Sequence, residues 1–285
     1  MQNQIQDKND VFNRATGLLV IEVINSNPNG DPDRESDPRM RDNDRRGEIS
    51  PVSFKRKLRD LVEMKEGPVW NALSDGLNPD KFMISESRQM TLKEIRELSE
   101  KEFMQRFWDG RVFGNTELEK GRNIPVKTGV VQFGLGVSIA PIDIERMTTT
   151  NPAVQEEKSR GMAPLAYRVV RHGIYCMPFF INPTFAHKTG CTKQDIGLML
   201  RLIPYAYKHT ASYIRSNVEL VHAWYIEHKS PLGSCSDFDL ISALTPKKVA
   251  DPEKPSVSRV DYYIPTEKDL PQELKEKVES IRDLV

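Results

Sequence analysis

Four apolar strands and two amphipathic helices alternate along the sequence, and their order limits the possible folds more than any other feature. Aliphatic and β-branched runs between turn residues predict strands at residues 15–25, 129–142, 167–181 and 218–228. Helical spacing of apolar residues predicts helices after the N-cap residues Ser50 and Thr192, the second divided by Pro204. The order β-α-β-β-α-β is the ferredoxin-like pattern that RNA-recognition modules also use. We therefore expect an α+β fold with a ferredoxin-like (RRM-like) βαββαβ domain.

The first of these helices is predicted to be amphipathic. Ser50 suits the N-cap and Pro51 the first helical position. The apolar stripe that would face the core consists of Phe54, Leu58, Leu61 and Val62. Lys55, Arg56 and Arg59 fall outside that stripe. The spacing therefore predicts a helix with a cationic outer face.

Positive charge is concentrated around this helix, although the chain holds 41 basic and 41 acidic residues. Residues 34–59 contain nine Arg or Lys against five Asp or Glu, whereas residues 251–285 contain six against nine. We expect the basic residues of the helix not to be paired with acids at i,i+4. Binding of nucleic acid depends on local charge, so residues 34–59 are a candidate phosphate-binding surface. A solvated helix face without a ligand is the alternative, and charge alone leaves it open.

The loop after the first strand, "NSNPNGDPD", has ordinary turn chemistry but also suits two kinds of site. Its amides, with Asn27 or Asn29, could contact sugar-phosphate. Its aspartates are Asp31, Asp33 and Asp37, and clustered carboxylates of this kind serve metal-assisted nucleases. No histidine accompanies them, so a metal site is the weaker interpretation.

The sequence gives little support for a disulfide framework, a metal site or a membrane-spanning segment. The three cysteines form no Cys-x-x-Cys pair, which argues against a disulfide framework or a zinc site, and the five histidines lack metal-ligand spacing. We predict no metal and no cofactor. No apolar run approaches the roughly 18 residues of a membrane span, and the polar N-terminus lacks a signal-peptide core. These features predict a cytoplasmic protein with no membrane partner.

Two long insertions interrupt the βαββαβ pattern. Residues 65–128 contain one predicted helix, which begins at a capping box of Thr91 and Glu94 and continues to Trp108. Residues 143–166 are polar, and their composition favours a surface loop; a protruding hairpin with an apolar wedge is the alternative. A short helix is also expected near residues 271–284.

Several motifs in chain order resemble the Cas-seven family of CRISPR-associated proteins, within the RAMP superfamily. They are "NPNGDPD", "ISPVSFKRKLRD", "WDGRVFGN", "VQFGLGVSI" and "YRVVRHGIYCMPFFINP". The likeness covers most of residues 15–230 and is greatest to backbone subunits of the type I-C surveillance complex (Cascade).

The resemblance implies a hand-shaped protein. The palm comprises residues 15–64, 129–142 and 167–230; residues 65–128 are the finger insertion, 143–166 the thumb hairpin and 231–285 a C-terminal extension. Copies of such a chain stack in a helical filament along a guide RNA, beside other Cascade subunits. They hold the RNA backbone and present its bases to target DNA, without catalysis. Related subunits of RNA-targeting complexes use a loop aspartate to cut RNA, so a metal-dependent ribonuclease is the alternative.

The resemblance also implies site residues. Ser50, Ser53, Lys55, Arg56 and Arg59 match helix positions that grip the guide backbone, and Met147 or Met162 lies where the thumb interrupts base pairing. The complete set expected to bind RNA is Asn27, Asn29, Arg41, Arg45, Arg46, Ser50, Ser53, Lys55, Arg56, Arg59, Gln132, Met147 and Met162.

Overall fold

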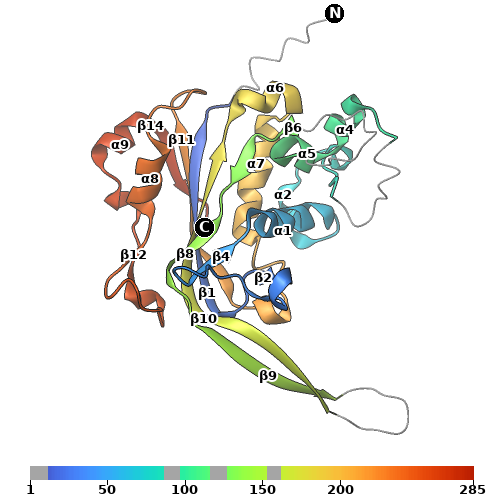
Figure 1. Cartoon of the computed structure of the whole chain (residues 1–285). Coiled ribbons are helices and arrows are strands. Elements are labelled where there is room, and N and C mark those ends of the chain that lie inside the picture. The colour runs from blue at the N-terminus through green and yellow to red at the C-terminus, as the bar shows by residue number, and fades with distance from the viewer. Residues whose placement is uncertain (1–11, 87–96, 116–126, 153–161) are drawn as a thin grey trace, which may run out of the picture.

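A large antiparallel sheet forms the centre of the protein. The computed structural model describes residues 12–86, 97–115, 127–152 and 162–285. The eight-stranded sheet has the order β14-β11-β1-β10-β8-β4, with β7 and β9 also paired to β10. Its strands are β1 (Ala15–Ser26), β4 (Arg46–Ile49), β7 (Val131–Phe133), β8 (Gly136–Pro141), β9 (Ile144–Pro152), β10 (Met162–Ile181), β11 (Val218–His228) and β14 (Val278–Asp283). The fold is therefore mixed α/β, arranged around this sheet (Figure 1).

Strand β1 is buried on both faces, which explains its uninterrupted apolar sequence. Because side chains alternate along a strand, Leu19 and Ile21 join the core on one side of the sheet. Leu18 and Val20 join a separate cluster on the other side. β1 pairs with β10 and with β11 along most of its length. It is the central strand to which both layers are attached.

Helices cover both faces of the sheet. α1 (Pro51–Glu63), α2 (Pro68–Leu73) and α7 (Lys193–Leu202) lie on one side, and α8 (Asp237–Leu244) and α9 (Gln272–Lys277) on the other (Figure 1). α4 (Glu100–Arg106), α5 (Trp108–Phe113) and α6 (Ala186–Thr189) complete the α-helices of the described residues. The predicted caps of two helices are present: the Ser50 side chain accepts from the Ser53 N–H, and Thr192 forms a capping box with Asp195. Pro204 ends α7 in a 3₁₀ turn.

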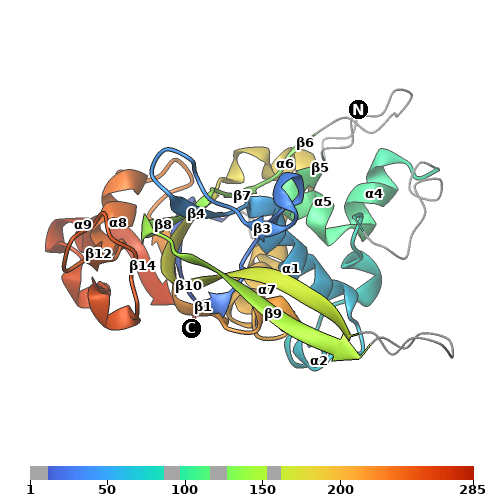
Figure 2. The ribbon, with the colours of Figure 1, turned by 60° about the horizontal axis from the view of Figure 1, so that its bottom comes forward.

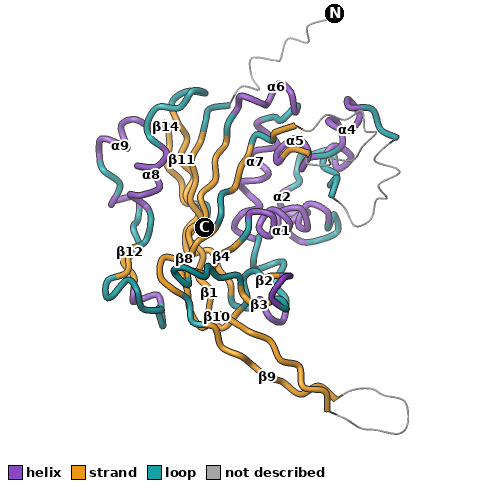
Figure 3. Tube along the Cα trace, in the orientation of Figure 1, coloured by secondary structure: helices purple, strands orange, loops and turns teal. Residues whose placement is uncertain are grey.

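The C-terminal segment differs from the prediction of a helix over residues 271–284. The helix α9 ends at Lys277, and Val278–Asp283 instead forms β14, which pairs with β11 at the sheet edge (Figure 3). Val278 is buried, and Ile281 packs against the same core cluster. Pairing with an edge strand has overridden the helical preference of the local sequence.

The polar segment 143–166 contains strands, whereas its composition favoured a loop. β9 pairs with the first half of the long strand β10 from Ile144↔Val170 to Pro152↔Met162. This hairpin extends away from the body of the protein (Figures 1 and 2). The second half of β10 belongs to the central sheet, so one continuous strand connects the hairpin rigidly to the core.

Short elements complete the described chain: β2 (Gly30–Asp31), β3 (Asp37–Pro38), β5 (Gly114–Asn115), β6 (Lys127–Thr128), β12 (Lys247–Lys248) and β13 (Tyr262–Tyr263). The predicted capping box of Thr91 and Glu94 lies outside the described residues; α4 begins instead at a capping box of Ser99 and Glu102, and the helix is interrupted at Phe107. The predicted strand 129–142 is divided into β7 and β8 at Gly134. Among the described helices, none combines the length and apolar character needed to cross a membrane.

Candidate nucleic-acid interface

Helix α1 is held in the core by the stripe that its sequence predicts. Phe54, Leu58 and Val62 are fully buried, and the Phe54 ring lies 5.1 Å from that of Phe133 and 5.8 Å from that of Tyr207. The first turn contains no acidic residue. The N-terminus of α1 is thus anchored against the sheet with its positive dipole end uncompensated by acids within the helix.

Arg59 does not face outward, and the prediction of a uniformly cationic outer face is wrong. Arg59 is 3% exposed. Its Nε donates to Asp109 Oδ2 at 3.0 Å and its Nη2 to Glu86 Oε1 at 2.9 Å, while its guanidinium lies 5.2 Å from the Phe113 ring centroid. The fully buried Asp109 carboxylate of α5 pairs with Arg59, because a buried charge needs a close counter-charge.

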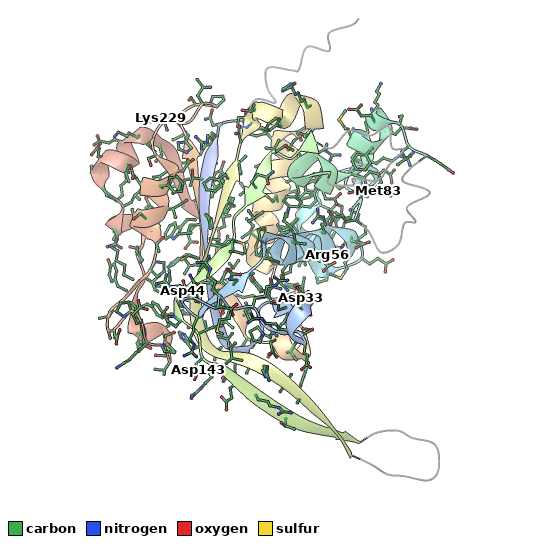
Figure 4. The ribbon with its side chains drawn as sticks, viewed as in Figure 1. Asp33, Asp44, Arg56, Met83, Asp143 and Lys229 are labelled. Atoms are coloured by element: carbon green, nitrogen blue, oxygen red, sulfur yellow. The ribbon has the colours of Figure 1, made fainter. Side chains whose placement is uncertain are left out.

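Arg56 is also paired, which contradicts the expectation that the basic residues lack partners at i,i+4. Its Nε donates to Asp60 Oδ1 at 2.7 Å, and its Nη2 donates to Glu63 Oε2 at 2.9 Å. Its Nη1 donates to the Glu86 main-chain oxygen at 2.6 Å. Figure 4 shows Arg56 projecting from α1. Both arginines therefore connect α1 to neighbouring chain.

The motif "WDGRVFGN" supplies the partners, a role that its sequence did not reveal. Asp109 also accepts from the Ser85 N–H at 2.8 Å. Trp108 Nε1 donates to the Asp195 main-chain oxygen at 3.1 Å, and Arg111 Nη2 donates to Asp195 Oδ1 at 2.7 Å. The motif thus joins α5 to α1 and α7 by buried polar contacts. This role of the motif is identified only by the tertiary structure, in which its buried charged residues pair with residues of α1 and α7.

Lys55 differs from the two arginines. It is half-buried, and its Nζ lies 5.8 Å from the Phe113 ring centroid. No ion pair of Lys55 occurs among the described residues. Burial, and then repulsion from Arg59, lowers its pKa. Of the three cations expected to form the outer face, Lys55 alone carries charge that the described chain leaves unneutralised.

The side chains of Asn27 and Asn29 are hydrogen-bonded within the protein and do not project into solvent. Asn29 Oδ1 accepts from the Ser50 N–H at 2.7 Å, and Asn27 Nδ2 donates to the Ser36 oxygen at 2.7 Å. Both side chains are buried. The loop is therefore fastened to the start of α1.

Three of the arginines that precede α1 were expected to bind RNA, and they differ in ion pairing. Arg41 Nε donates to Glu48 Oε1 at 2.7 Å, and Arg46 Nε lies 3.8 Å from Asp44 Oδ2. Arg45 is exposed, forms no ion pair within the described residues, and has a left-handed backbone with φ of 55°. Arg45 is the one of the three whose charge is fully presented to solvent.

Asp31 and Asp37 lie opposite each other in the β2–β3 pair, and each makes a contact of its own. Asp31 accepts from the Asp33 N–H at 3.2 Å, and Asp37 is ion-paired with Arg168 of β10. Asp33 is exposed on the surface below α1 (Figure 4). Within the described ranges, no three His, Cys, Asp or Glu side chains are placed to hold a metal ion.

The remaining predicted residues lie apart from α1's cations. Gln132 on β7 is exposed and donates to the Gly129 oxygen at 3.2 Å. Met147 is half-buried near the base of the hairpin, directly opposite Tyr167. Met162 pairs with Pro152 at the far end of the described hairpin. Met147 therefore lies within the described hairpin, and Met162 lies at its far end.

Lys57, one of the nine basic residues of 34–59, was assigned no role from the sequence. Lys57 is 7% exposed and is directed to the other side of α1. Lys57 lies three residues after Phe54 and four before Leu61, so helical spacing places it beside the apolar stripe. The tertiary structure shows which groups bury it.

Comparisons with known proteins give one family and several similar folds. The family model described as CRISPR-associated protein Cas7 matches residues 13–267. No curated protein matches the sequence. Among solved structures, one chain of a "CRISPR RNA-guided surveillance complex, pre-nicking" has a TM-score of 0.49 and 14% identity, covering 75% of this chain and 78% of that one. A chain of a "CRISPR RNA-guided surveillance complex" has a TM-score of 0.44 and 15% identity, covering 75% and 69%.

Proposed function

The chain belongs to the CRISPR-associated protein Cas7 family, whose model spans nearly its whole length, and from that premise we propose that it is a guide-RNA-binding subunit of a CRISPR surveillance complex. It grips the guide's sugar-phosphate backbone and leaves the bases free to pair with target DNA. Family membership over residues 13–267 is the observation that carries this proposal.

The arrangement of the sheet supports a hand-like interpretation of the fold. The order β11-β1-β10-β8, with α1 following β1 and α7 following β10, agrees with a ferredoxin-like palm. The β9–β10 hairpin would be the thumb and residues 65–128 the finger. α8 and the C-terminal segment cover the second face of the sheet, so the RNA binds along the α1 side and the thumb, not across the sheet.

The groups proposed to contact phosphate are those on this side that the described structure leaves available. They are Ser50 and Ser53 at the N-terminus of α1, Lys55 on its exposed edge and Arg45 in the preceding loop. The N–H groups of Ser50 and Ser53 are already hydrogen-bonded to Asn29 Oδ1 and Ser50 Oγ, so the donors proposed here are their hydroxyl groups and the unpaired cations, which suit phosphate oxygens. Arg56 and Arg59 hold α1 in place instead of contacting RNA.

The proposed partners follow from the same interpretation. Copies of the chain would stack along one guide RNA as a type I-C backbone in the cytoplasm, with other subunits at its ends. Heterologous contacts that do not close produce such arrays. The chain itself would be non-catalytic.

The direct test is to purify the chain and measure, from its absorbance ratio, whether nucleic acid copurifies, and then to size what is released. We expect RNA of uniform length bound in a salt-dependent manner. Absence of such RNA from a preparation made from cells that express a guide RNA would disprove the proposal, even if the chain binds added RNA. Cleavage of RNA with Mg²⁺, abolished by changing Asp31, Asp33 and Asp37, would instead support the ribonuclease alternative.

A further inference from the structure

The side of α1 opposite Arg59 has a different chemical character. At about 100° per residue, Lys57 and Arg59 project in nearly opposite directions. Lys57 Nζ donates to Thr210 Oγ1 at 3.0 Å and lies 5.0 Å from the Tyr207 ring centroid. Lys57 is 7% exposed and Tyr207 is 4% exposed. A lysine charge is therefore buried between α1 and the turn that follows α7.

Arg215, at the end of the 3₁₀ turn Tyr213–Arg215, is a second positive charge whose electrostatic effect reaches Lys57. Burial, and then the charge of Arg215, lowers the pKa of Lys57 to about 8; Asp60, on α1 itself, acts in the opposite direction. Neither Lys57 nor Arg215 has an ion-pair partner in the described part of the chain. Two neighbouring cations without a carboxylate between them repel each other.

Polar atoms around these cations also lack partners. The buried Tyr207 hydroxyl and Arg215 Nε have no hydrogen-bond partner among the described residues, and neither does Asn27 Oδ1. Asn27 adjoins this region, because its N–H donates to the Ile214 oxygen at 2.7 Å. Buried polar groups are normally hydrogen-bonded. The Tyr207 hydroxyl and Arg215 Nε, which are unpartnered donors beside two unneutralised cations, are the complement of an oxyanion, whereas Asn27 Oδ1 is an acceptor and would not bind one.

We propose that Lys57, Arg215 and the Tyr207 hydroxyl form a pocket for one phosphodiester group of a bound nucleic-acid strand, an inference that rests on the proposed function. The two non-bridging oxygens accept from Lys57 Nζ, Arg215 Nε and the Tyr207 hydroxyl. The anion supplies the counter-charge that the chain lacks.

A strand fits this location better than free phosphate because an aromatic surface adjoins it. Tyr213 is 66% exposed and lies two residues before Arg215. Its ring meets that of Tyr167, at the base of the hairpin, edge-on at 5.5 Å. Exposed aromatic rings stack bases while nearby cations hold the backbone. Phosphate and base contacts would thus lie side by side.

The test measures binding of a fluorescently labelled single-stranded RNA to the full chain as a function of salt. We expect Lys57→Met and Arg215→Met each to weaken binding about 10-fold and to lower the salt slope by about one phosphate contact. Lys247→Met is the matched control, because Lys247 is an exposed cation on β12. It should bind nearly as the parent does. Lys57→Arg, which keeps the charge, should retain most of the affinity and reports on folding.

Each remaining outcome has one meaning. If both methionine variants bind RNA with the parent affinity and salt slope, the pocket is wrong while the proposed function stands. If inorganic phosphate stabilises the parent through Lys57 but RNA affinity does not change in the variants, the pocket takes a free anion, which also overturns the inference. If the variants lose affinity for single-stranded RNA of any sequence but no guide RNA copurifies from cells, the pocket is supported and the proposed function fails.

Discussion

The two sides of helix α1 handle positive charge in opposite ways. On the side facing α5, Arg56 and Arg59 are neutralised by Asp60, Glu63 and the buried Asp109. On the side facing the turn after α7, Lys57 and Arg215 lie near each other without a carboxylate in contact, as far as the described residues show. One helix thus contributes both a structural ion-pair network and unneutralised cations.

This difference separates charge used for folding from charge left for a ligand. Removing one partner of a buried ion pair leaves an uncompensated buried charge, which considerably lowers the free energy of unfolding. A buried cation without a partner reduces stability in the free protein and gains a counter-charge only on binding. The basic run of α1 therefore divides into arginines that are ion-paired and lysines that have no ion pair within the described residues.

The largest expected effect comes from breaking the structural side. Asp109→Asn leaves Arg59 buried without its main counter-charge, and the free energy of unfolding should fall by about 3–5 kcal/mol. Urea denaturation measures this change. Asp143→Asn, which removes the half-exposed partner of Arg171, is the control and should cost less than about 1 kcal/mol. Equal losses in the two variants would show that the Asp109 pair has no special structural role.

The opposite side should respond with a gain in stability. Lys57→Met removes a buried, unpaired charge and should raise the free energy of unfolding by about 1–3 kcal/mol at pH 7. Folding depresses the pKa of Lys57 to about 8, so the parent recovers stability as pH rises from 8 toward the unfolded pKa of about 10.4. The difference between variant and parent should therefore shrink at pH 10. A variant less stable than the parent at pH 7 would contradict this account of the Lys57 environment.

A third prediction contrasts neighbouring cations of α1 in RNA binding. Lys55→Met should lower RNA affinity about 5-fold, close to 1 kcal/mol, because Lys55 has no ion pair in the described structure. Arg56→Met should leave the affinity nearly unchanged. Fluorescence titration at one fixed salt concentration compares the two. A greater loss for Arg56 would mean that its ion pairs open on binding.

The smallest effect concerns the Arg56 network itself. Arg56→Gln should cost about 0.5 kcal/mol of stability, because this i,i+4 pair with Asp60 is partly exposed. The loss should diminish at high salt, which screens surface pairs. Thermal unfolding at low and high salt measures both. A cost comparable to that of Asp109→Asn would place Arg56 in the buried network.

Local patterns in the sequence predicted the main strands, the two capped helices and the buried stripe of α1. Period-two and helical spacing depend on neighbouring residues, so Phe54 and Leu58 could be assigned to the core without a structure. The strand β14 was not predicted, and the β9–β10 hairpin was expected only as the alternative to a loop and from the family resemblance, since each depends on strand pairing that the local pattern does not show.

By itself, the sequence determined which segments form strands and helices, where α1 begins and which of its residues are apolar. Only the tertiary structure decided what its charges do. Arg59 meets Asp109 across 50 positions, and Lys57 meets Thr210 across 153. The physical reason is that the effect of a charged side chain on stability or binding depends on the groups that surround it. These groups come from remote parts of the chain.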